Sequence, residues 1–243
     1  MRSLKTAIVV TIALAVAMTT VLAPVASARS PLVAYAIGLG TDDGPGRPPF
    51  VGIVRELPDG LSREMRGENW QPGCPVPLSG LRLLTLSYWG YDRRPHTGPL
   101  VVNAAVAEDV VWVFEQLYDA HFPIQTMRLT KRFRPKREKH DTKSNPTASF
   151  NCRPVLTPFG PTENWSMHSY GLAIDINPMQ NPFVVDGYVK NRFARPYIDR
   201  SLDDPRMIRE GDVVVRSFEA IGWEWGGNWT SSKDYMHFSS NGD

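Results

Sequence analysis

The sequence predicts an α+β fold, because two segments carry a helical pattern and the segments around them resemble short strands. Residues 106–120 place apolar side chains at near-helical spacing and carry acids in the first turn. Residues 211–221 repeat this spacing and predict a second helix. Strand-like segments lie before, between and after these two helices.

The strand-like segments around the first helix are short. Residues 81–89 are apolar enough for a buried element, and residues 100–102 indicate a strand that follows a turn signal at His96-Thr97-Gly98. Residues 124–129 alternate loosely after Phe122-Pro123, which indicates another strand.

The first 28 residues have the parts of a secretory signal peptide. Arg2 and Lys5 precede an apolar run over residues 7–22, and small residues at positions 26–28 form a cleavage site. The run is shorter than the roughly 20 residues that a spanning helix needs, so we expect cleavage rather than retention as an anchor. The mature chain is then secreted, without a stable membrane span.

Cleavage leaves 243 minus 28, or 215 residues, and removes two basic residues and no acid, so the formal net charge falls from +2 to zero. This balance gives no reason to expect a nucleic-acid partner. The length predicts one domain. We place it at residues 71–243, after an irregular N-terminal segment at residues 29–70, where Gly and Pro are dense.

The two cysteines, Cys74 and Cys152, belong to a chain bound for an oxidising compartment, so one disulfide joining them is the simplest account. The alternative, Cys152 as a metal ligand, is disfavoured because a lone thiol has no C-x-x-C partner. The bridge would contribute on the order of 4 kcal/mol in the chain-entropy model.

Two of the five histidines occupy segments unlike the rest of the chain. A strand over residues 172–177 would turn one face to the core (Leu172, Ile174 and Ile176) and the other away from it (Ala173, Asp175 and Asn177). Asp175 is thereby placed on an open face, and Gly171 permits a sharp turn that brings His168 to the same side. The alternative for this histidine and this acid is a hydrogen-bonded pair.

The second such segment ends at His237. In a strand, Met236 and Phe238 would point inward and His237 outward, again to an open face. Two imidazoles and a carboxylate are a ligand set that suits Zn²⁺ and leaves a fourth position for water. Three nearby tryptophans are expected either as walls of a cleft or as core: Trp223, Trp225 and Trp229.

A catalytic zinc site also needs a carboxylate that accepts a proton and passes it to the leaving group. Asp234, three residues before His237, is the candidate. The alternative is an ordinary turn or cap acid.

The motif S-x-H-x-x-G-x-A-x-D at residues 166–175 and the motif D-x-x-H at residues 234–237 resemble those of the VanY-like D-alanyl-D-alanine carboxypeptidase family. This family belongs to the zinc peptidases that include lysostaphin and the hedgehog fold. The resemblance runs from about Cys74 to Phe238. It implies a small antiparallel sheet with packed helices and a zinc site in a groove over the sheet.

The resemblance also implies roles for individual residues. The Zn²⁺ ligands are implied to be His168, Asp175 and His237, with Asp234 as the catalytic acid/base where many relatives have Glu. Arg153 lies where such enzymes place a substrate-binding arginine, whose guanidinium can bind a carboxylate or an oxyanion. An arginine beside a disulfide could equally be structural. Ser166 is expected to contact the substrate.

The implied function is hydrolysis of peptidoglycan stem peptides in the bacterial cell envelope, with D-alanyl-D-alanine carboxypeptidase activity favoured. The alternatives are an L-Ala-D-Glu or cross-bridge endopeptidase, a hydrolase of other peptides, and a zinc-containing wall-binding module without activity. Residues 131–143 carry seven basic side chains, which are expected to form a solvated loop or to attract anionic wall polymers.

Overall fold

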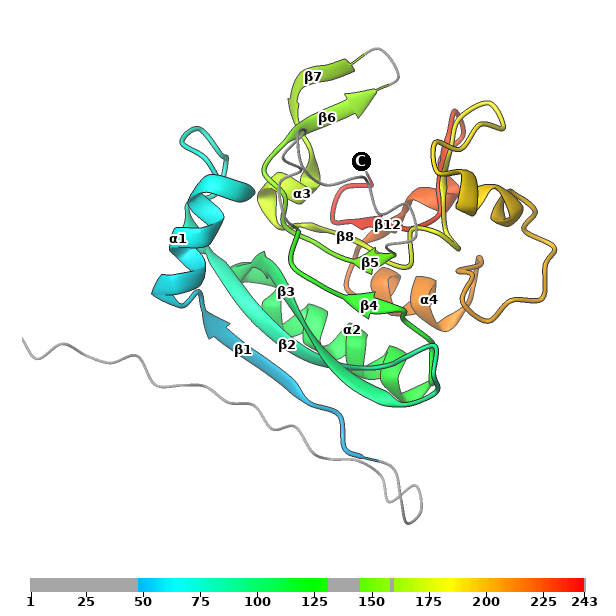
Figure 1. Cartoon of the computed structure of the whole chain (residues 1–243), viewed down its shortest axis with the longest axis horizontal. Helices are drawn as coiled ribbons and strands as arrows, with labels where there is room; N and C mark the ends of the chain where they lie inside the picture. Colours follow the sequence, from blue (N-terminus) through cyan, green and yellow to red (C-terminus); the bar gives the residue numbers. More distant parts are fainter. Residues whose placement is uncertain (1–47, 131–144, 158–159, 243) are drawn as a thin grey trace, which may run out of the picture. The chain divides into compact units, whose positions relative to one another are not determined.

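A computed structural model of the chain describes residues 48–130, 145–157 and 160–242 (Figure 1). Helices and small, mostly antiparallel sheets make up these residues, which confirms the α+β class. The expected signal peptide and the basic run at residues 131–143 lie outside the described residues.

The first sheet is antiparallel in the order β1-β2-β3 and is covered on one face by helix α2 (Ala107–Asp119) (Figure 1). Strand β1 is Gly52–Glu56, β2 is Leu81–Trp89 and β3 is Pro95–Asn103. The predictions of a buried element at residues 81–89 and of the first helix are confirmed, because the helix buries its apolar face, including Val110 and Phe114, against this sheet.

The turn expected at residues 96–98 is wrong, since these residues belong to β3. The chain reverses instead between Gly90 and Arg94, whose N–H and C=O are joined at 2.8 Å. A glycine is needed at position 98 for close packing rather than for a turn. A Cβ there would lie 2.5 Å from the Cβ of Met127.

The irregular structure expected over residues 29–70 is also wrong for β1 and for helix α1 (Asp59–Glu68). All five residues of β1 pair with β2, and α1 buries Met65 in a small cluster around Leu81 and Phe150. Both elements are stabilised by partners distant in the sequence, which local Gly and Pro content does not report.

The second sheet is antiparallel in the order β10-β12-β8, from Glu224–Trp225, His237–Ser239 and Ala173–Asp175. Helix α4 (Val213–Ala220) packs against α2 and against this sheet, with the rings of Phe218 and Phe238 stacked at 4.2 Å. The second predicted helix is thus confirmed, and one apolar core joins the two sheets. Trp223 and Trp225 belong to that core.

The remaining elements are short. The two-stranded ribbons pair β4 (Thr126–Met127) with β5 (Pro146–Thr147), β6 (Pro154–Thr157) with β7 (Gly160–Trp165), and β9 (Phe183–Val184) with β11 (Lys233–Asp234). The short helices are α3 (Met167–Tyr170) and the 3₁₀ turns η1 (Leu78–Gly80), η2 (Ala104–Val106), η3 (Arg192–Ile198) and η4 (Gly226–Asn228). The strand expected at residues 124–129 is reduced to β4. Among the residues described, no helix has the length and apolar character to cross a bilayer.

The predicted disulfide is present between Cys74 and Cys152, whose Cα atoms lie 5.9 Å apart. It joins the loop after α1 to the residue before Arg153. The N–H of Cys152 also donates to the carbonyl of Asn69 at 3.0 Å, which fixes the same junction.

Candidate metal centre and catalytic groove

The pairing of β8 with β12 places Asp175 directly opposite His237. Residues opposite one another in an antiparallel pair project to the same face, so the register alone brings this carboxylate and this imidazole together. The backbone of Ala148 continues the sheet beyond β8, since it exchanges two hydrogen bonds with Asp175 at 3.1 and 2.9 Å. The strand that carries Asp175 is therefore held on both edges.

His168 reaches the same place from helix α3. The Ser166 hydroxyl caps this helix by accepting a hydrogen bond from the His168 N–H at 3.4 Å. Gly171 ends it in the left-handed conformation at φ +68°, and a Cβ there would lie 2.6 Å from the backbone nitrogen of Asn103. The predicted sharp turn before the strand is confirmed, and it leads directly from His168 into β8.

The three side chains form one cluster whose ligand atoms all lie within 4.8 Å of one another. His168 Nε2 is 3.3 Å and His237 Nδ1 is 3.1 Å from the same oxygen, Asp175 Oδ1. His168 Nδ1 lies 2.8 Å from the carbonyl of Ser149, so this nitrogen carries the proton and Nε2 is left as the donor to a metal.

Burial would raise the pKa of the Asp175 carboxyl, but the adjacent His168 and His237 outweigh burial and hold it well below its usual range. The group is therefore ionised at neutral pH. An ionised carboxylate with two nearly buried imidazoles is a donor set that suits zinc.

Asp234 lies beside this cluster, on β11. The residue is half-buried, yet its Oδ1 is inaccessible to solvent and accepts no hydrogen bond from the described residues. Burial and the charge of Asp175 raise the pKa of Asp234 to about 7, and His237, Arg153 and the backbone of Met236 offset this only in part. A carboxyl with this pKa accepts and returns a proton at neutral pH.

The backbone of Gly226 packs closely against Asp234. A Cβ on Gly226 would lie 2.7 Å from the carbonyl oxygen and 3.0 Å from the Cβ of Asp234. Only glycine lets η4 approach β11 this closely. The sequence contained Gly226 next to Trp225 but gave no signal of this contact.

Arg153 is positioned by the backbone around α3. Its N–H donates to Ser169 Oγ at 2.8 Å, and the same hydroxyl donates to the Arg153 carbonyl at 2.7 Å. The preceding Asn151 N–H donates to the carbonyl of His168 at 3.0 Å. The guanidinium, anchored at one nitrogen to Pro154 O (3.2 Å), shares the groove with the cluster, and its charge acts on Asp234.

A groove of about 950 Å³ contains the cluster, Asp234 and Arg153. One wall is the β6–β7 hairpin, which presents the exposed side chains of Val155 and Leu156. Trp229 also lines the groove, and its ring centroid lies 5.6 Å from that of His237. Of the three tryptophans, this one alone lines the groove.

Several orientations differ from the predicted alternation. Met236 was expected to point inward, but it lines the groove beside His237, while Phe238 is fully buried as predicted. Leu172 is only half-buried, whereas Ala173 and Asn177, expected on the open face, are fully buried. The alternation fails because neighbouring segments cover both faces at these positions. The Ser149 hydroxyl, for example, donates to the carbonyl of Ala173.

The other described histidines lie outside the groove. His96 contacts Asp92 at 2.9 Å, and the His121 ring stacks on Trp89 at 4.5 Å. Ser166 does line the groove, but it is only 7% exposed and its hydroxyl caps α3, so the structure shows a capping role for it. A contact between Ser166 and substrate stays a prediction.

Comparison with known proteins adds one finding. A family model described as D-alanyl-D-alanine carboxypeptidase matches residues 160–240, which carry the three clustered side chains and Asp234. Searches among curated proteins and among solved structures returned no match. The resemblance inferred from the two motifs is therefore confirmed over residues 160–240, which are similar to the D-alanyl-D-alanine carboxypeptidase family.

Proposed function

We propose that the chain is a secreted zinc metallopeptidase that hydrolyses peptidoglycan stem peptides, with D-alanyl-D-alanine carboxypeptidase as its activity. The observation that carries the proposal is the position of Asp234. Its unpartnered, buried carboxylate oxygen lies in the same groove as three converging metal-ligand atoms. The family match supports a peptidase of this type.

The residues that would hold zinc are His168 through Nε2, Asp175 through its carboxylate and His237 through Nδ1. When bound, zinc supplies a Lewis acid for the scissile carbonyl and lowers the pKa of water toward neutrality. The hydrogen bond from His168 Nδ1 to the Ser149 carbonyl keeps this imidazole in the tautomer that the site needs.

Two further side chains act on the substrate. Asp234 accepts a proton from the attacking water and returns it to the leaving amine, because its carboxyl lies in the same groove as the three ligand side chains. Arg153 binds the C-terminal carboxylate of the stem peptide or the oxyanion that forms at the scissile carbonyl, because a fixed guanidinium presents several donors to either group.

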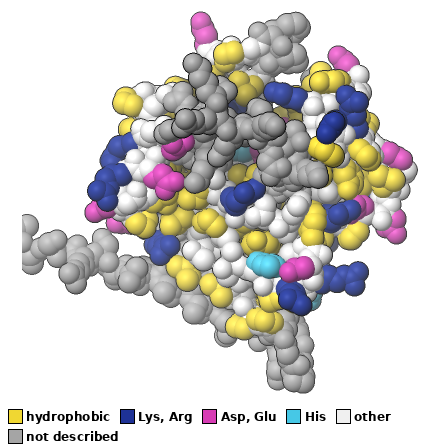
Figure 2. All heavy atoms as spheres, viewed as in Figure 1, with side chains coloured by type: hydrophobic (Ala, Val, Ile, Leu, Met, Phe, Trp, Pro, Cys, Tyr) yellow, Lys and Arg dark blue, Asp and Glu magenta, His cyan; other side chains and the backbone are white. Residues whose placement is uncertain are grey.

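An endopeptidase that cuts the L-Ala-D-Glu bond or a cross-bridge is the second candidate. It is supported by the size of the groove, about 950 Å³, and by the exposed Val155 and Leu156 along one wall, which offer surface beyond a terminal dipeptide. A zinc-containing wall-binding module without activity is disfavoured, because Asp234 and Arg153 both line the groove. On the face drawn in Figure 2, basic and acidic side chains of the described residues are interspersed. The basic run that was expected to attract anionic wall polymers, residues 131–143, lies outside the described residues.

The test is hydrolysis of a synthetic muramyl pentapeptide by the mature, zinc-loaded protein, with products identified by mass. Asp234→Ala is measured beside it, with zinc content determined in both, and Asp203→Ala removes an exposed acid as the matched control. Release of D-alanine by the wild type and the control, and not by zinc-loaded Asp234→Ala, supports the proposal. Cross-linked wall fragments serve as a second substrate, and cleavage of these fragments alone supports the endopeptidase. A zinc-loaded protein that cleaves neither the pentapeptide nor the fragments refutes the peptidase.

A further inference from the structure

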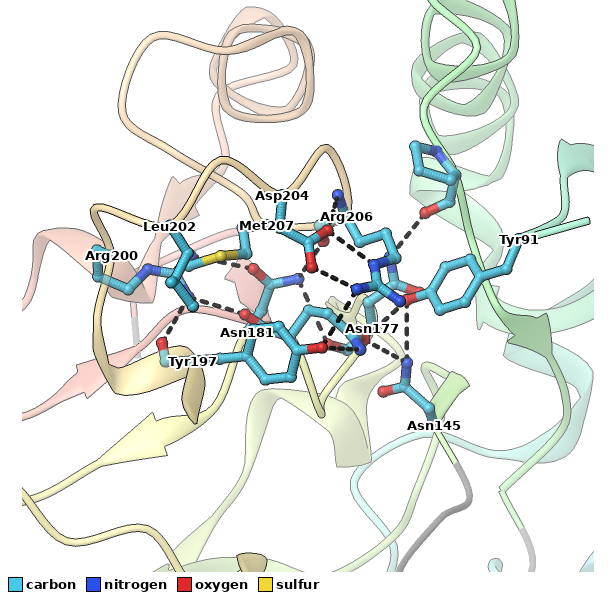
Figure 3. Close-up of polar contacts among 12 residues, drawn as sticks. Tyr91, Asn145, Asn177, Asn181, Tyr197, Arg200, Leu202, Asp204, Arg206 and Met207 are labelled. Carbon is cyan, nitrogen blue, oxygen red and sulfur yellow. Dashed lines mark hydrogen bonds and ion pairs between the residues drawn. The ribbon is translucent and has the colours of Figure 1, made fainter. Parts of the chain in front are cut away.

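The guanidinium of Arg200 links the chain that leads into β9 with Tyr235, the residue after Asp234. Arg200 follows η3, and its Nη1 donates to the carbonyls of Gln180 at 2.8 Å and Tyr197 at 3.1 Å (Figure 3). Its Nη2 donates to Asn181 Oδ1 at 3.2 Å and to the carbonyl of Ile208 at 2.6 Å. Four oxygens from three stretches of chain therefore converge on one side chain.

The same guanidinium lies flat against the residue next to Asp234. The Cζ of Arg200 is 4.1 Å from the centre of the Tyr235 ring. Arg200 is half-buried, and within the described residues it forms no ion pair with a carboxylate. Because its contacts are backbone and amide oxygens and a ring face, its contribution is to geometry rather than to charge neutralisation.

Some of these contacts lie next to the ribbon that carries Asp234, just before β9 and just after β11. Gln180 and Asn181 lead into β9, and in the ladder β9 pairs with β11 so that Phe183 faces Asp234. The Tyr235 N–H donates to the carbonyl of Pro182 at 3.3 Å. A ribbon with two paired positions on each strand is marginal by itself, so its position depends on what holds its ends.

We infer that Arg200 is a positioning residue for the catalytic acid/base: it joins the approach to β9 with the Tyr235 ring and thereby fixes Asp234 against the groove. The inference rests on the proposed function of Asp234. The metal ligands lie on a different sheet and on α3, so loss of Arg200 should move the base without releasing the metal.

The test replaces Arg200 by Met, which keeps most of the apolar stem and removes the guanidinium. Arg206→Met is the matched control, because Arg206 is also half-buried and stacks on a tyrosine, Tyr91 at 5.1 Å, while its guanidinium donates to Asp204 and Tyr197 rather than to the approach to β9 (Figure 3). A displacement of about 1 Å costs on the order of 10²-fold in rate, so kcat should fall about 10- to 100-fold in Arg200→Met, with KM and zinc content near those of the wild type. The control should keep its kcat.

A second pair of variants separates positioning from folding. Tyr235→Phe keeps the ring and should keep kcat, whereas Tyr235→Leu removes the ring, retains the four hydrogen bonds of Arg200 and should lower kcat as Arg200→Met does. If Arg200→Met does not fold, the comparison of Tyr235→Phe with Tyr235→Leu tests the inference instead. Unchanged kcat in folded Arg200→Met, or loss of zinc together with activity, overturns the inference.

Amide hydrogen exchange makes the result independent of turnover. Residues 233–236 should exchange faster in Arg200→Met than in the wild type and in Arg206→Met, while residues 173–175 stay protected. If the wild type cleaves no stem peptide, the proposed function fails, but faster exchange in Arg200→Met still supports the role of Arg200 in holding this segment. Equal exchange in all three proteins overturns it.

Discussion

Replacing Asp234 by Asn should stabilise the metal-free protein at alkaline pH although it abolishes the proposed activity. The wild-type carboxyl has a pKa of about 7 in the folded chain and an ordinary value of 3.8. Below pH 3.8 both states bind the proton, so the stabilising effect of the raised pKa is fully present there. Between pH 3.8 and about 7 the unfolded state gives up its proton while the folded state keeps it, so stability falls as pH rises.

The size of the loss follows from the shift. About three pH units, at 1.36 kcal/mol each, set an upper limit of about 4 kcal/mol above pH 7. Asn carries no charge to bury, so Asp234→Asn should escape this loss. The variant should be more stable than the wild type at pH 8 by up to about 4 kcal/mol, and the difference should shrink toward pH 4.

The assay is urea unfolding followed by tryptophan fluorescence, in a chelator, with the disulfide oxidised, at pH 4.5, 6 and 8. Asp203→Asn serves as the control, since Asp203 is exposed. A difference between Asp234→Asn and the wild type that is the same at all three pH values would refute the reasoning, because it would report packing or hydrogen bonding rather than buried charge.

The remaining predictions concern the structure around the site. The double variant Cys74→Ala with Cys152→Ala should lose about 4 to 5 kcal/mol in urea unfolding, because the bridge closes a loop with a sequence separation of 78 residues, and an unchanged midpoint would contradict this. Gly226→Ala should lower kcat at least about 10-fold while zinc is retained, because its Cβ would push on the backbone of Asp234; Gly60→Ala, where a Cβ meets nothing within 4 Å, is the control. His237→Ala should lose zinc in metal analysis and lose activity that added zinc does not restore, whereas chelated wild type should recover with zinc. Retention of one zinc per chain by His237→Ala would exclude this residue as a ligand.

The sequence by itself predicted which side chains gather in the groove. Strand alternation predicted that Asp175 and His237 face an open side, and the family resemblance implied the ligand set of His168, Asp175 and His237. In the structure these three side chains form one cluster. Helices α2 and α4 were also predictable, because each buries one apolar face and so carries a helical period in its own sequence. Residues 81–89 were predictable from their apolar content.

The tertiary structure decided what depends on a distant partner. Strand β1 forms because it pairs with β2, and α1 forms because it packs on the cluster around Phe150. The sequence of residues 52–68 does not identify these partners. The pKa of Asp234, the tautomer of His168 and the links made by Arg200 likewise depend on Asp175, the Ser149 carbonyl and Tyr235. Burial and contacts between residues far apart in sequence arise only when the chain is folded, and local patterns carry no record of them.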